Sequence, residues 1–295
     1  MEDQAGVLRE IQRNSSGPVM ERKRRSRDIR VIAVTSGKGG VGKTNITANF
    51  AYFLSKMGKR TLLLDADAGL ANIDVILGIT PKYNLYHVLR GEKNLSEVIV
   101  EGPGKIKILP ASSGIQEMAE LSKGQKFTLL EELDMMDDEI DFMLIDTAAG
   151  ITGNVTYFNM AAKEIIVVVS SEPTSLTDAY ALIKILNQGY AVRRFMLLVN
   201  MVVDSQEAMG VYTRLNNATN HFLDLPIEYI GYIPQDQHVT RAVRQQKLLA
   251  EAFPDSRASA SMSEIVGKLL RRQSKQYETG TIKFFDRAVI ETHGQ

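Results

Sequence analysis

The sequence predicts an α/β fold in which a mostly parallel, twisted sheet carries helices on both sides, giving three layers. Two observations carry this prediction. Short apolar runs alternate with amphipathic stretches along residues 29–274, and a glycine-rich loop joins the first apolar run to the first helical pattern. Strands buried on both faces are near-continuous apolar runs, and strands that alternate with helices pair in parallel. We therefore expect ligands at the carboxyl ends of the strands.

The candidate elements follow one another in a regular order. The expected strands are residues 31–35, 61–65, 106–110, 142–146, 165–170, 195–199 and 227–233. Helical patterns lie between them, for example at residues 176–188 and 262–272. Residues 1–28 are polar and residues 275–295 form a tail with its own aromatic cluster. We expect three units: an N-terminal segment, a central domain over 29–274 and a C-terminal tail.

Composition excludes several classes of protein. The 295 residues include no cysteine, which removes disulfides, thiolate metal sites and iron–sulfur clusters. A formal net charge of zero gives no global field that favours nucleic acid. No apolar run reaches the roughly 18 residues of a membrane span, and the start of the chain lacks the pattern of a signal peptide. The expected location is the cytoplasm.

Residues 36–44 read SGKGGVGKT, a phosphate-binding loop between a strand and a helix. The small residues let backbone N–H groups turn toward one centre, and the helix N-terminus adds positive dipole. Lys43 is expected to reach the β- and γ-phosphates, and the Thr44 hydroxyl to hold Mg²⁺. The residues expected to bind nucleotide through this loop are Gly37, Gly39, Gly40, Val41, Gly42, Lys43 and Thr44.

A second lysine, Lys38, lies near the start of the loop, where an ordinary phosphate-binding loop does not require one. With it, residues 37–44 resemble the deviant Walker A motif of the MinD/ParA family of ATPases. The resemblance implies a P-loop NTPase fold of that type, ATP and Mg²⁺ as cofactors, and a homodimer formed with ATP. It also implies that Lys38 crosses the dimer interface to the partner's nucleotide, as an arginine finger does elsewhere. A solvated loop lysine is the alternative.

Three carboxylates follow apolar runs in register with the loop. Asp65 and Asp67 end one run, and Asp146 ends another. Asp146 resembles the Walker B aspartate, which acts through a water of the Mg²⁺ shell. Asp65 and Asp67 resemble the family's second acidic motif, which implies that Asp67 orients the attacking water and that Asp65 lies near Mg²⁺. Which of the two matters more stays open, and each alone is also typical of a turn or helix N-cap.

Recognition of the base is expected at the ends of the last two strands. Asn200 follows the run 195–199, and its amide can donate to and accept from adenine. Pro234 and Asp236 close the last strand and match the family's adenine contacts. Asn200 is equally compatible with a simple turn. Residues 172–178 resemble a switch near the γ-phosphate.

The start of the chain reads DQAGVLR from Asp3. It resembles the DQAxxLR motif of the FlhG family (also called FleN or YlxH), MinD-like ATPases of bacterial flagellar assembly. In that family the segment is a helix that activates FlhF, a GTPase of the signal-recognition-particle type. The resemblance assigns this role to Asp3, Gln4, Ala5, Leu8 and Arg9, with Gln4 orienting a water in the partner's site. A terminus with chance identity is the alternative.

The tail carries an amphipathic stretch over residues 282–290. On a helical wheel, Ile282, Phe284, Phe285 and Val289 share one side, as in helices that lie in a membrane interface. The stretch resembles the C-terminal membrane-targeting helix of the MinD/FlhG class. One copy binds marginally, whereas two copies on a dimer gain by avidity. A helix that docks on its own domain is the alternative.

We interpret the chain as an FlhG-type ATPase that controls flagellar number or placement. Expected partners are a second copy, FlhF, flagellar C-ring proteins, an AAA+ transcription activator and the anionic inner face of the cell membrane, bound reversibly. No specific nucleic acid is expected. A MinD-type division-site regulator and a nucleotide-binding scaffold without turnover are alternatives. So is a ParA-type positioning ATPase, for which Arg241, Arg244 and Lys247 offer a small basic face.

Overall fold

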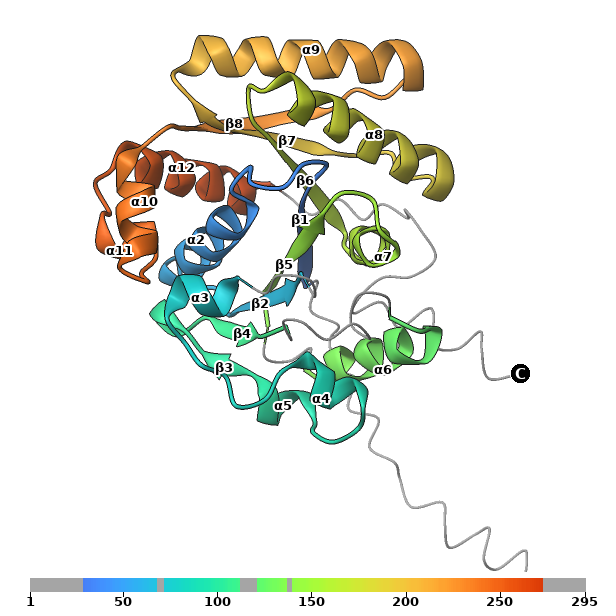
Figure 1. Cartoon of the computed structure of the whole chain (residues 1–295), viewed down its shortest axis with the longest axis vertical. Coiled ribbons are helices and arrows are strands. Elements are labelled where there is room, and N and C mark those ends of the chain that lie inside the picture. The colour runs from blue at the N-terminus through green and yellow to red at the C-terminus, as the bar shows by residue number, and fades with distance from the viewer. Residues whose placement is uncertain (1–28, 68–71, 112–120, 137–139, 273–295) are drawn as a thin grey trace, which may run out of the picture.

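The computed structural model describes residues 29–67, 72–111, 121–136 and 140–272 (Figure 1). Eight strands within these ranges form one sheet in the order β3-β4-β2-β5-β1-β6-β7-β8. The strands are β1 (Arg30–Ser36), β2 (Thr61–Ala66), β3 (Val100–Glu101), β4 (Lys107–Leu109), β5 (Phe142–Ala149), β6 (Glu164–Val169), β7 (Met196–Val202) and β8 (Glu228–Pro234). Every neighbouring pair is parallel except β3 and β4.

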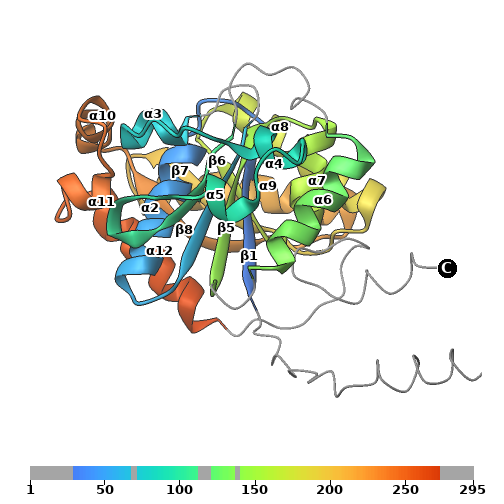
Figure 2. The same cartoon turned by 90° about the horizontal axis from the view of Figure 1, so that it is seen from below.

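Helices cover both faces of this sheet (Figures 1 and 2). They are α2 (Lys43–Lys56), α3 (Ile73–Leu77), α4 (Leu85–Leu89), α5 (Leu95–Val98), α6 (Lys123–Asp134), α7 (Gly153–Ala161), α8 (Pro173–Tyr190), α9 (Ser205–Leu223), α10 (Gln237–Arg244), α11 (Leu249–Ala252) and α12 (Arg257–Arg271), with a 3₁₀ turn, η1 (Pro103–Lys105). The predicted three-layer, mostly parallel α/β fold is confirmed.

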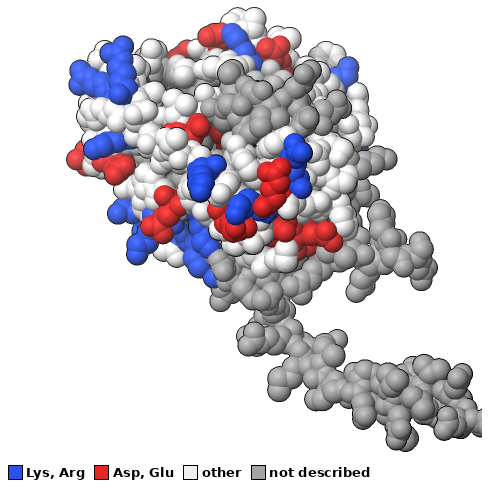
Figure 3. Space-filling view, turned by 60° about the horizontal axis from the view of Figure 1, so that its bottom comes forward, with Lys and Arg blue, Asp and Glu red and all other residues white. Residues whose placement is uncertain are grey.

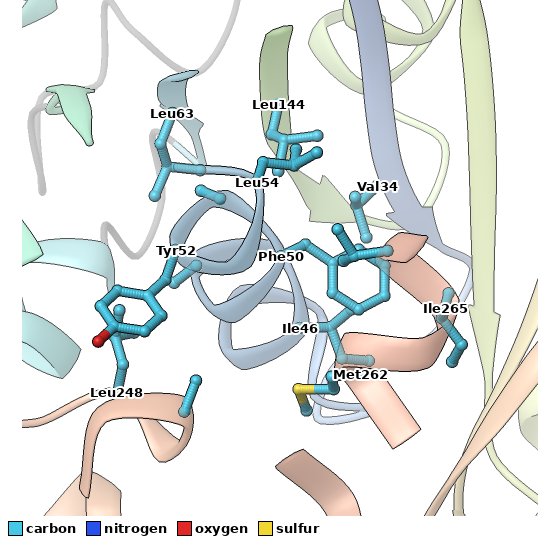
Figure 4. Packing of buried hydrophobic residues seen from close by; sticks show 14 of the residues in the cluster. Val34, Ile46, Phe50, Tyr52, Leu54, Leu63, Leu144, Leu248, Met262 and Ile265 are labelled. Carbon is cyan, nitrogen blue, oxygen red and sulfur yellow. The ribbon is translucent and has the colours of Figure 1, made fainter. Parts of the chain in front are cut away.

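The two faces arise from the alternation of side chains along each strand. In β1, Ile32 and Val34 face a cluster shared with α2 and α12, whereas Val31 and Ala33 face a cluster shared with α4 to α7. Figure 4 shows the first cluster, where Phe50 of α2 packs among side chains of the sheet and of α12. Because both faces are covered, the central strands are apolar at nearly every position.

All seven strands predicted from the sequence are present, and their ends differ by a few residues. The described part of the structure contains one further strand, β3, which was not predicted because a run of two residues is too short to show a pattern. Helix α8 begins at Pro173, three residues before the predicted start. Proline suits the first helical turn because it has no N–H to leave unpaired.

Arg30, at the start of β1, connects several elements at the amino-terminal ends of the central strands. Its guanidinium donates to both carboxylate oxygens of Glu164, at 2.7 and 2.8 Å, and to the backbone oxygen of Leu269 in α12, at 2.6 Å. The same group lies 5.1 Å from the ring centroid of Phe142. Arg30 thereby joins β1, β6 and α12 at the end of the sheet opposite the glycine-rich loop. The described domain also begins and ends there, at Ile29 and Arg272.

The segments predicted to activate a partner, at residues 3–9, and to bind membrane, at residues 282–290, lie outside the described residues. Within the described ranges, no helix combines the length and apolar character needed to cross a membrane.

Candidate functional site

The glycine-rich loop occupies the carboxyl end of β1 and leads directly into α2. Gly40 and Gly42 have φ of +78° and +88°, a conformation that residues with a side chain rarely adopt, and Gly42 caps α2. Gly37 is required for a different reason. A Cβ placed on it would lie 2.1 Å from the backbone carbonyl carbon of Asp178 in α8. The loop is thus shaped by local conformation and by the close approach of a second helix.

Lys43 and Asp146 form the charged centre of the site. Both are buried, Lys43 at the first turn of α2 and Asp146 in β5. The Thr47 hydroxyl lies 3.3 Å from an oxygen of Asp146 and 2.8 Å from the Lys43 backbone oxygen. Burial raises the pKa of Asp146 to about 6, although the Lys43 charge and a hydrogen bond from the Thr44 hydroxyl lower it. The Asp146 carboxylate therefore lies beside the N-terminus of α2 and the charge of Lys43.

Asp65 lies beside Asp146, because the register of β2 and β5 pairs the two residues. Asp65 is buried, and its oxygens accept hydrogen bonds from the backbone N–H groups of Asp67, Asn72 and Ile73, at 3.0 to 3.3 Å. Burial, and then the charge of Asp146, raises its pKa well above the ordinary range. Asp67 is half-exposed at the end of the same strand. A cation bound beside these carboxylates would stabilise their ionised forms.

The donor set here fits Mg²⁺, which prefers oxygen ligands and combines one or two carboxylates with the oxygens of phosphates. The Thr44 hydroxyl is near enough to the Asp146 carboxylate to lower its pKa. Within the described part of the chain, no group of three or more His, Asp or Glu side chains is arranged to hold a metal ion unaided. A carboxylate and a hydroxyl at this place would leave the other positions around Mg²⁺ to phosphate oxygens and water.

Lys38 is bound within its own chain. Its Nζ contacts a carboxylate oxygen of Glu172, the N-cap of α8, and lies 3.0 Å from the Thr174 hydroxyl. Side chains of Lys38 and Glu172 are 35% and 62% exposed. The segment expected to act as a switch therefore touches the glycine-rich loop. The role of Lys38 across a dimer interface stays a prediction.

The residues predicted for the base lie at the ends of β7 and β8. Asn200 is buried, and its Nδ2 donates to the Val41 backbone oxygen at 2.7 Å. Pro234 ends β8. Asp236 caps α10 by accepting from the His238 N–H at 2.9 Å, and it also accepts from the Ala258 N–H at 3.2 Å. Although burial raises the pKa of Asp236, these hydrogen bonds lower it. Contacts of these residues with adenine stay predictions.

Sequence reasoning missed two contributors to the site. Thr47 lies one helical turn after Lys43, so helical spacing alone places it on the same side of α2. Glu172 is 134 residues from Lys38, and no local pattern connects the two.

The basic residues Arg241, Arg244 and Lys247 are exposed on α10 and the turn after it. None of the three has an ion-pair partner within the part of the chain that the structure describes. Figure 3 shows positive and negative side chains interspersed among the described residues on the face it presents. These three cations are a limited basis for binding DNA, which is bound through many phosphate contacts.

Comparison with known proteins identifies relatives that match most of the chain. Residues 29–195 match the AAA domain family. The antiactivator FleN of Pseudomonas aeruginosa is 44% identical over 263 residues, 89% of this chain and 94% of FleN. The flagellum site-determining protein YlxH of Helicobacter pylori is 35% identical over 257 residues, 87% of this chain and 85% of YlxH. The septum site-determining protein MinD of Pyrococcus horikoshii, complexed with Mg-ADP, has a TM-score of 0.67 at 25% identity, covering 82% of this chain and 96% of that one.

Proposed function

Because the chain belongs to the MinD/ParA family of ATP-binding proteins and is a homologue of FleN and YlxH, we propose that it is an ATP-hydrolysing switch that regulates the number or placement of flagella. The observation that carries this proposal is the arrangement at the end of β1. There the loop with Lys38 and Lys43 meets the buried carboxylates of Asp65 and Asp146.

The loop residues bind the phosphates in this proposal. Backbone N–H groups of residues 37–42 and the N-terminus of α2 face the phosphate oxygens, and Lys43 neutralises the charge of the β- and γ-phosphates. Mg²⁺, when bound with the nucleotide, supplies further neutralisation of the charge that develops on the phosphates. Thr44 would hold it directly and Asp146 through a water, and the effect of the Thr44 hydroxyl on the pKa of Asp146 supports this pairing.

The two acidic residues that end β2 take different roles. The oxygens of Asp65 already accept three backbone hydrogen bonds, so Asp65 orders the turn beyond β2 and adds negative charge near the ion. Asp67 is the more accessible carboxylate, and it is the candidate to orient the attacking water. Lys38 completes the site of a second copy once it leaves Glu172, which makes hydrolysis dependent on dimer formation.

The flagellar assignment draws on the relatives' names and on the motif at residues 3–9. FleN is named an antiactivator and YlxH a flagellum site-determining protein. We propose that Asp3, Gln4, Ala5, Leu8 and Arg9 stimulate FlhF. Flagellar C-ring proteins and an AAA+ transcription activator are the further partners of this proposal.

The tail ties this switch to location. Ile282, Phe284, Phe285 and Val289 insert into the inner face of the cell membrane, and a dimer carries two such segments. Because avidity multiplies the weak affinity of each segment, ATP binding would recruit the protein and hydrolysis would release it.

Three measurements test the proposal. ATP turnover should be lost in Lys43→Ala and retained in Lys184→Ala, a control on the exposed side of α8. GTP turnover by FlhF should rise with wild-type protein and not with Gln4→Ala. Binding to anionic liposomes should require ATP and be lost in the double variant Phe284→Ser, Phe285→Ser but kept in Lys283→Ala. Absence of ATP turnover would reject the switch, whereas absence of FlhF stimulation would reject only the flagellar step proposed for residues 3–9.

A further inference from the structure

Strand β5 is irregular directly after Asp146. Its register with β1 pairs Asp146 with Val34 and then shifts, so that two residues of β5 lie opposite Thr35 alone. The first of these two residues is Thr147. A shift of this kind, as in a β-bulge, bends a strand and re-aims its side chains, and it is common next to active sites. The irregularity therefore sets the direction in which the chain leaves the Asp146 carboxylate.

Three buried polar side chains hold the chain at this point. The Thr147 hydroxyl lies 3.0 Å from the Thr35 hydroxyl and 3.2 Å from the Val34 backbone oxygen. Asn159 Nδ2, in α7, donates to the Thr35 hydroxyl at 3.2 Å and to the Val155 backbone oxygen at 2.8 Å. Thr35, Thr147 and Asn159 are each at most 1% exposed. These three residues, which we call the threonine–asparagine cluster, join the ends of β1 and β5 to α7.

The cluster lies on the opposite side of the sheet from the Asp146 carboxylate. Successive side chains of a strand point to opposite faces. The Asp146 carboxylate meets the Thr47 hydroxyl of α2, at 3.3 Å, whereas Thr147 meets Thr35, which is bound by Asn159 of α7. Helices α2 and α7 pack on opposite faces of β1 and β5 (Figure 1). Asp146 is thus contacted by α2 from one face, while the cluster holds its backbone from the other.

Asn159 is an uncommon choice for so buried a position. Its Oδ1 has no hydrogen-bond partner among the described residues, although the side chain is fully buried. Burying an acceptor without a partner is unfavourable, and an apolar side chain would avoid the loss. The amide is therefore of use here for its donor, which reaches the Thr35 hydroxyl.

Beyond the irregularity, the chain is tied to the glycine-rich loop. The Gly150 N–H donates to the Ser36 backbone oxygen at 3.0 Å, and the Ser36 hydroxyl donates to the Lys38 backbone oxygen at 2.7 Å. The residues between Asp146 and Gly150 are therefore fixed at one end by the cluster and at the other by the loop. Loss of the cluster would leave only the second of these attachments.

We propose that Thr35, Thr147 and Asn159 are positioning residues, which hold the end of β5 so that the Asp146 carboxylate stays beside Lys43 and Thr44, where Mg²⁺ would bind with the nucleotide. They act through Asp146 and do not contact the ligand. The cluster gives α7, on the far face of the sheet, a part in the nucleotide site. This inference rests on the proposed binding of ATP with Mg²⁺.

The test compares ATP binding with and without the ion. Thr147→Val removes the hydroxyl and keeps the branched shape of the side chain. Affinity for ATP in Mg²⁺ should fall by about 2- to 12-fold, the equivalent of one hydrogen bond. Affinity for ATP in EDTA should stay within about twofold of the wild type, because the cluster is not assigned to the phosphates. Thr147→Ser, which keeps the hydroxyl, should retain most of the affinity in Mg²⁺.

The matched control is Thr219→Val. Thr219 is a buried threonine of α9 whose hydroxyl donates to the Asn216 backbone oxygen at 3.1 Å, away from the site. This variant should change neither affinity. Isothermal titration calorimetry measures both, and urea denaturation without ligand verifies that each variant is folded.

Two further measurements separate positioning from support of the fold. Asn159→Ala should weaken binding of ATP in Mg²⁺, and its combination with Thr147→Val should cost less than the sum of the two, because both act on one network. In the ligand-free protein, hydrogen exchange of the Gly150 amide, followed by NMR, should be faster in Thr147→Val than in Thr219→Val.

A folded Thr147→Val protein with the wild-type ratio of ATP affinities in Mg²⁺ and in EDTA would overturn the inference, even if its stability were lower. If Thr147→Val does not fold, Thr35→Val provides the same comparison. Wild-type protein whose ATP affinity is independent of Mg²⁺ would reject the proposed role of the ion, and this inference with it. Wild-type protein that binds no ATP would reject the proposed function itself.

Discussion

Lys38 Nζ and the Glu172 carboxylate are in contact within one chain, and together they join the glycine-rich loop to the start of α8. A lysine that completes a partner's site must first leave this contact. The ion pair is largely exposed, so it is expected to contribute only about 0.2–1 kcal/mol. A contact of this strength is easily exchanged for a triphosphate, whose charge is greater.

Glu172→Gln should therefore make dimer formation with ATP easier, because the lysine loses its competing partner. We expect the dimer dissociation constant in Mg-ATP to fall by about 2- to 30-fold, because a dimer gives up two such contacts, which together contribute about 0.4–2 kcal/mol. Analytical ultracentrifugation measures it, with Lys38→Ala as the variant that should fail to dimerise. Glu264→Gln is the matched control, since Glu264 forms an exposed ion pair with Lys268 in α12. Weaker dimerisation of Glu172→Gln would mean that Glu172 acts within the dimer, contrary to this prediction.

Gly37→Ala should destabilise the protein by about 1–3 kcal/mol, because its Cβ would overlap the backbone of Asp178 and neither helix nor loop can yield easily. Gly39→Ala, two residues along the same loop, should change the free energy of unfolding by less than about 0.5 kcal/mol. The nearest atom to its added Cβ, in Ala149, is 4.0 Å away. Urea denaturation compares the two, and equal stabilities would show that α8 moves freely relative to the loop.

Asp146→Asn should stabilise the nucleotide-free protein at pH 7 while it weakens Mg²⁺-dependent ATP hydrolysis. Because burial raises the pKa of Asp146 from 3.8 to about 6, the folded protein keeps a proton that the unfolded chain releases between those values. The free energy of unfolding of the wild type therefore falls as pH rises from about 4 to about 6, and it stays low above that range. A difference of about two pKa units corresponds to roughly 2–3 kcal/mol.

Urea denaturation at pH 4, 5, 6 and 7 checks this prediction. The stability advantage of Asp146→Asn should be small at pH 4 and reach its full value near pH 7. The asparagine keeps an oxygen that accepts from Thr47, so this hydrogen bond is not lost with the charge. An advantage that is absent at pH 7, or that shrinks as pH rises, would contradict the assignment of the raised pKa to Asp146.

Glu164→Gln should destabilise the protein by about 2–4 kcal/mol, since it leaves the largely buried Arg30 guanidinium without its opposite charge. The comparison is Asp141→Asn, which weakens a more exposed ion pair with Arg60. The side chains of Arg60 and Asp141 are 39% and 32% exposed. That change should cost about 1 kcal/mol or less. Chemical denaturation of both variants at pH 7 ranks them, and an equal cost would mean that burial does not strengthen the Arg30 pair.

The sequence was sufficient for the strands and for the glycine-rich loop, because both are local patterns. A buried parallel strand is an apolar run, and the loop is a continuous motif of nine residues from Ser36 to Thr44. Contacts between distant segments could not be predicted this way. Asn200 and Val41 are 159 residues apart, and only the order of the strands brings them together.

The roles of polar residues at strand ends were also hard to predict from the sequence, because one residue type can serve several purposes there. Asp236 is an example, since its carboxylate is engaged with the backbone of α10 and α12. An aspartate before a helix is typical of both capping and ligand binding, and the sequence does not separate the two. The left-handed backbone conformation of Met201 likewise could not be predicted from the residues around it.

The contacts of Arg30 and the glycine-rich loop lie at opposite ends of β1. The proposed nucleotide site lies where β1 ends, whereas the described domain begins at Ile29 and ends at Arg272, next to where β1 starts. In the proposed dimer, in which two copies meet through their glycine-rich loops, Ile29 and Arg272 of each copy would lie on the side of the domain away from the interface. We therefore expect that the segments before Ile29 and after Arg272, which the proposed function assigns to a GTPase and to the membrane, leave the domain on the side away from the proposed nucleotide site.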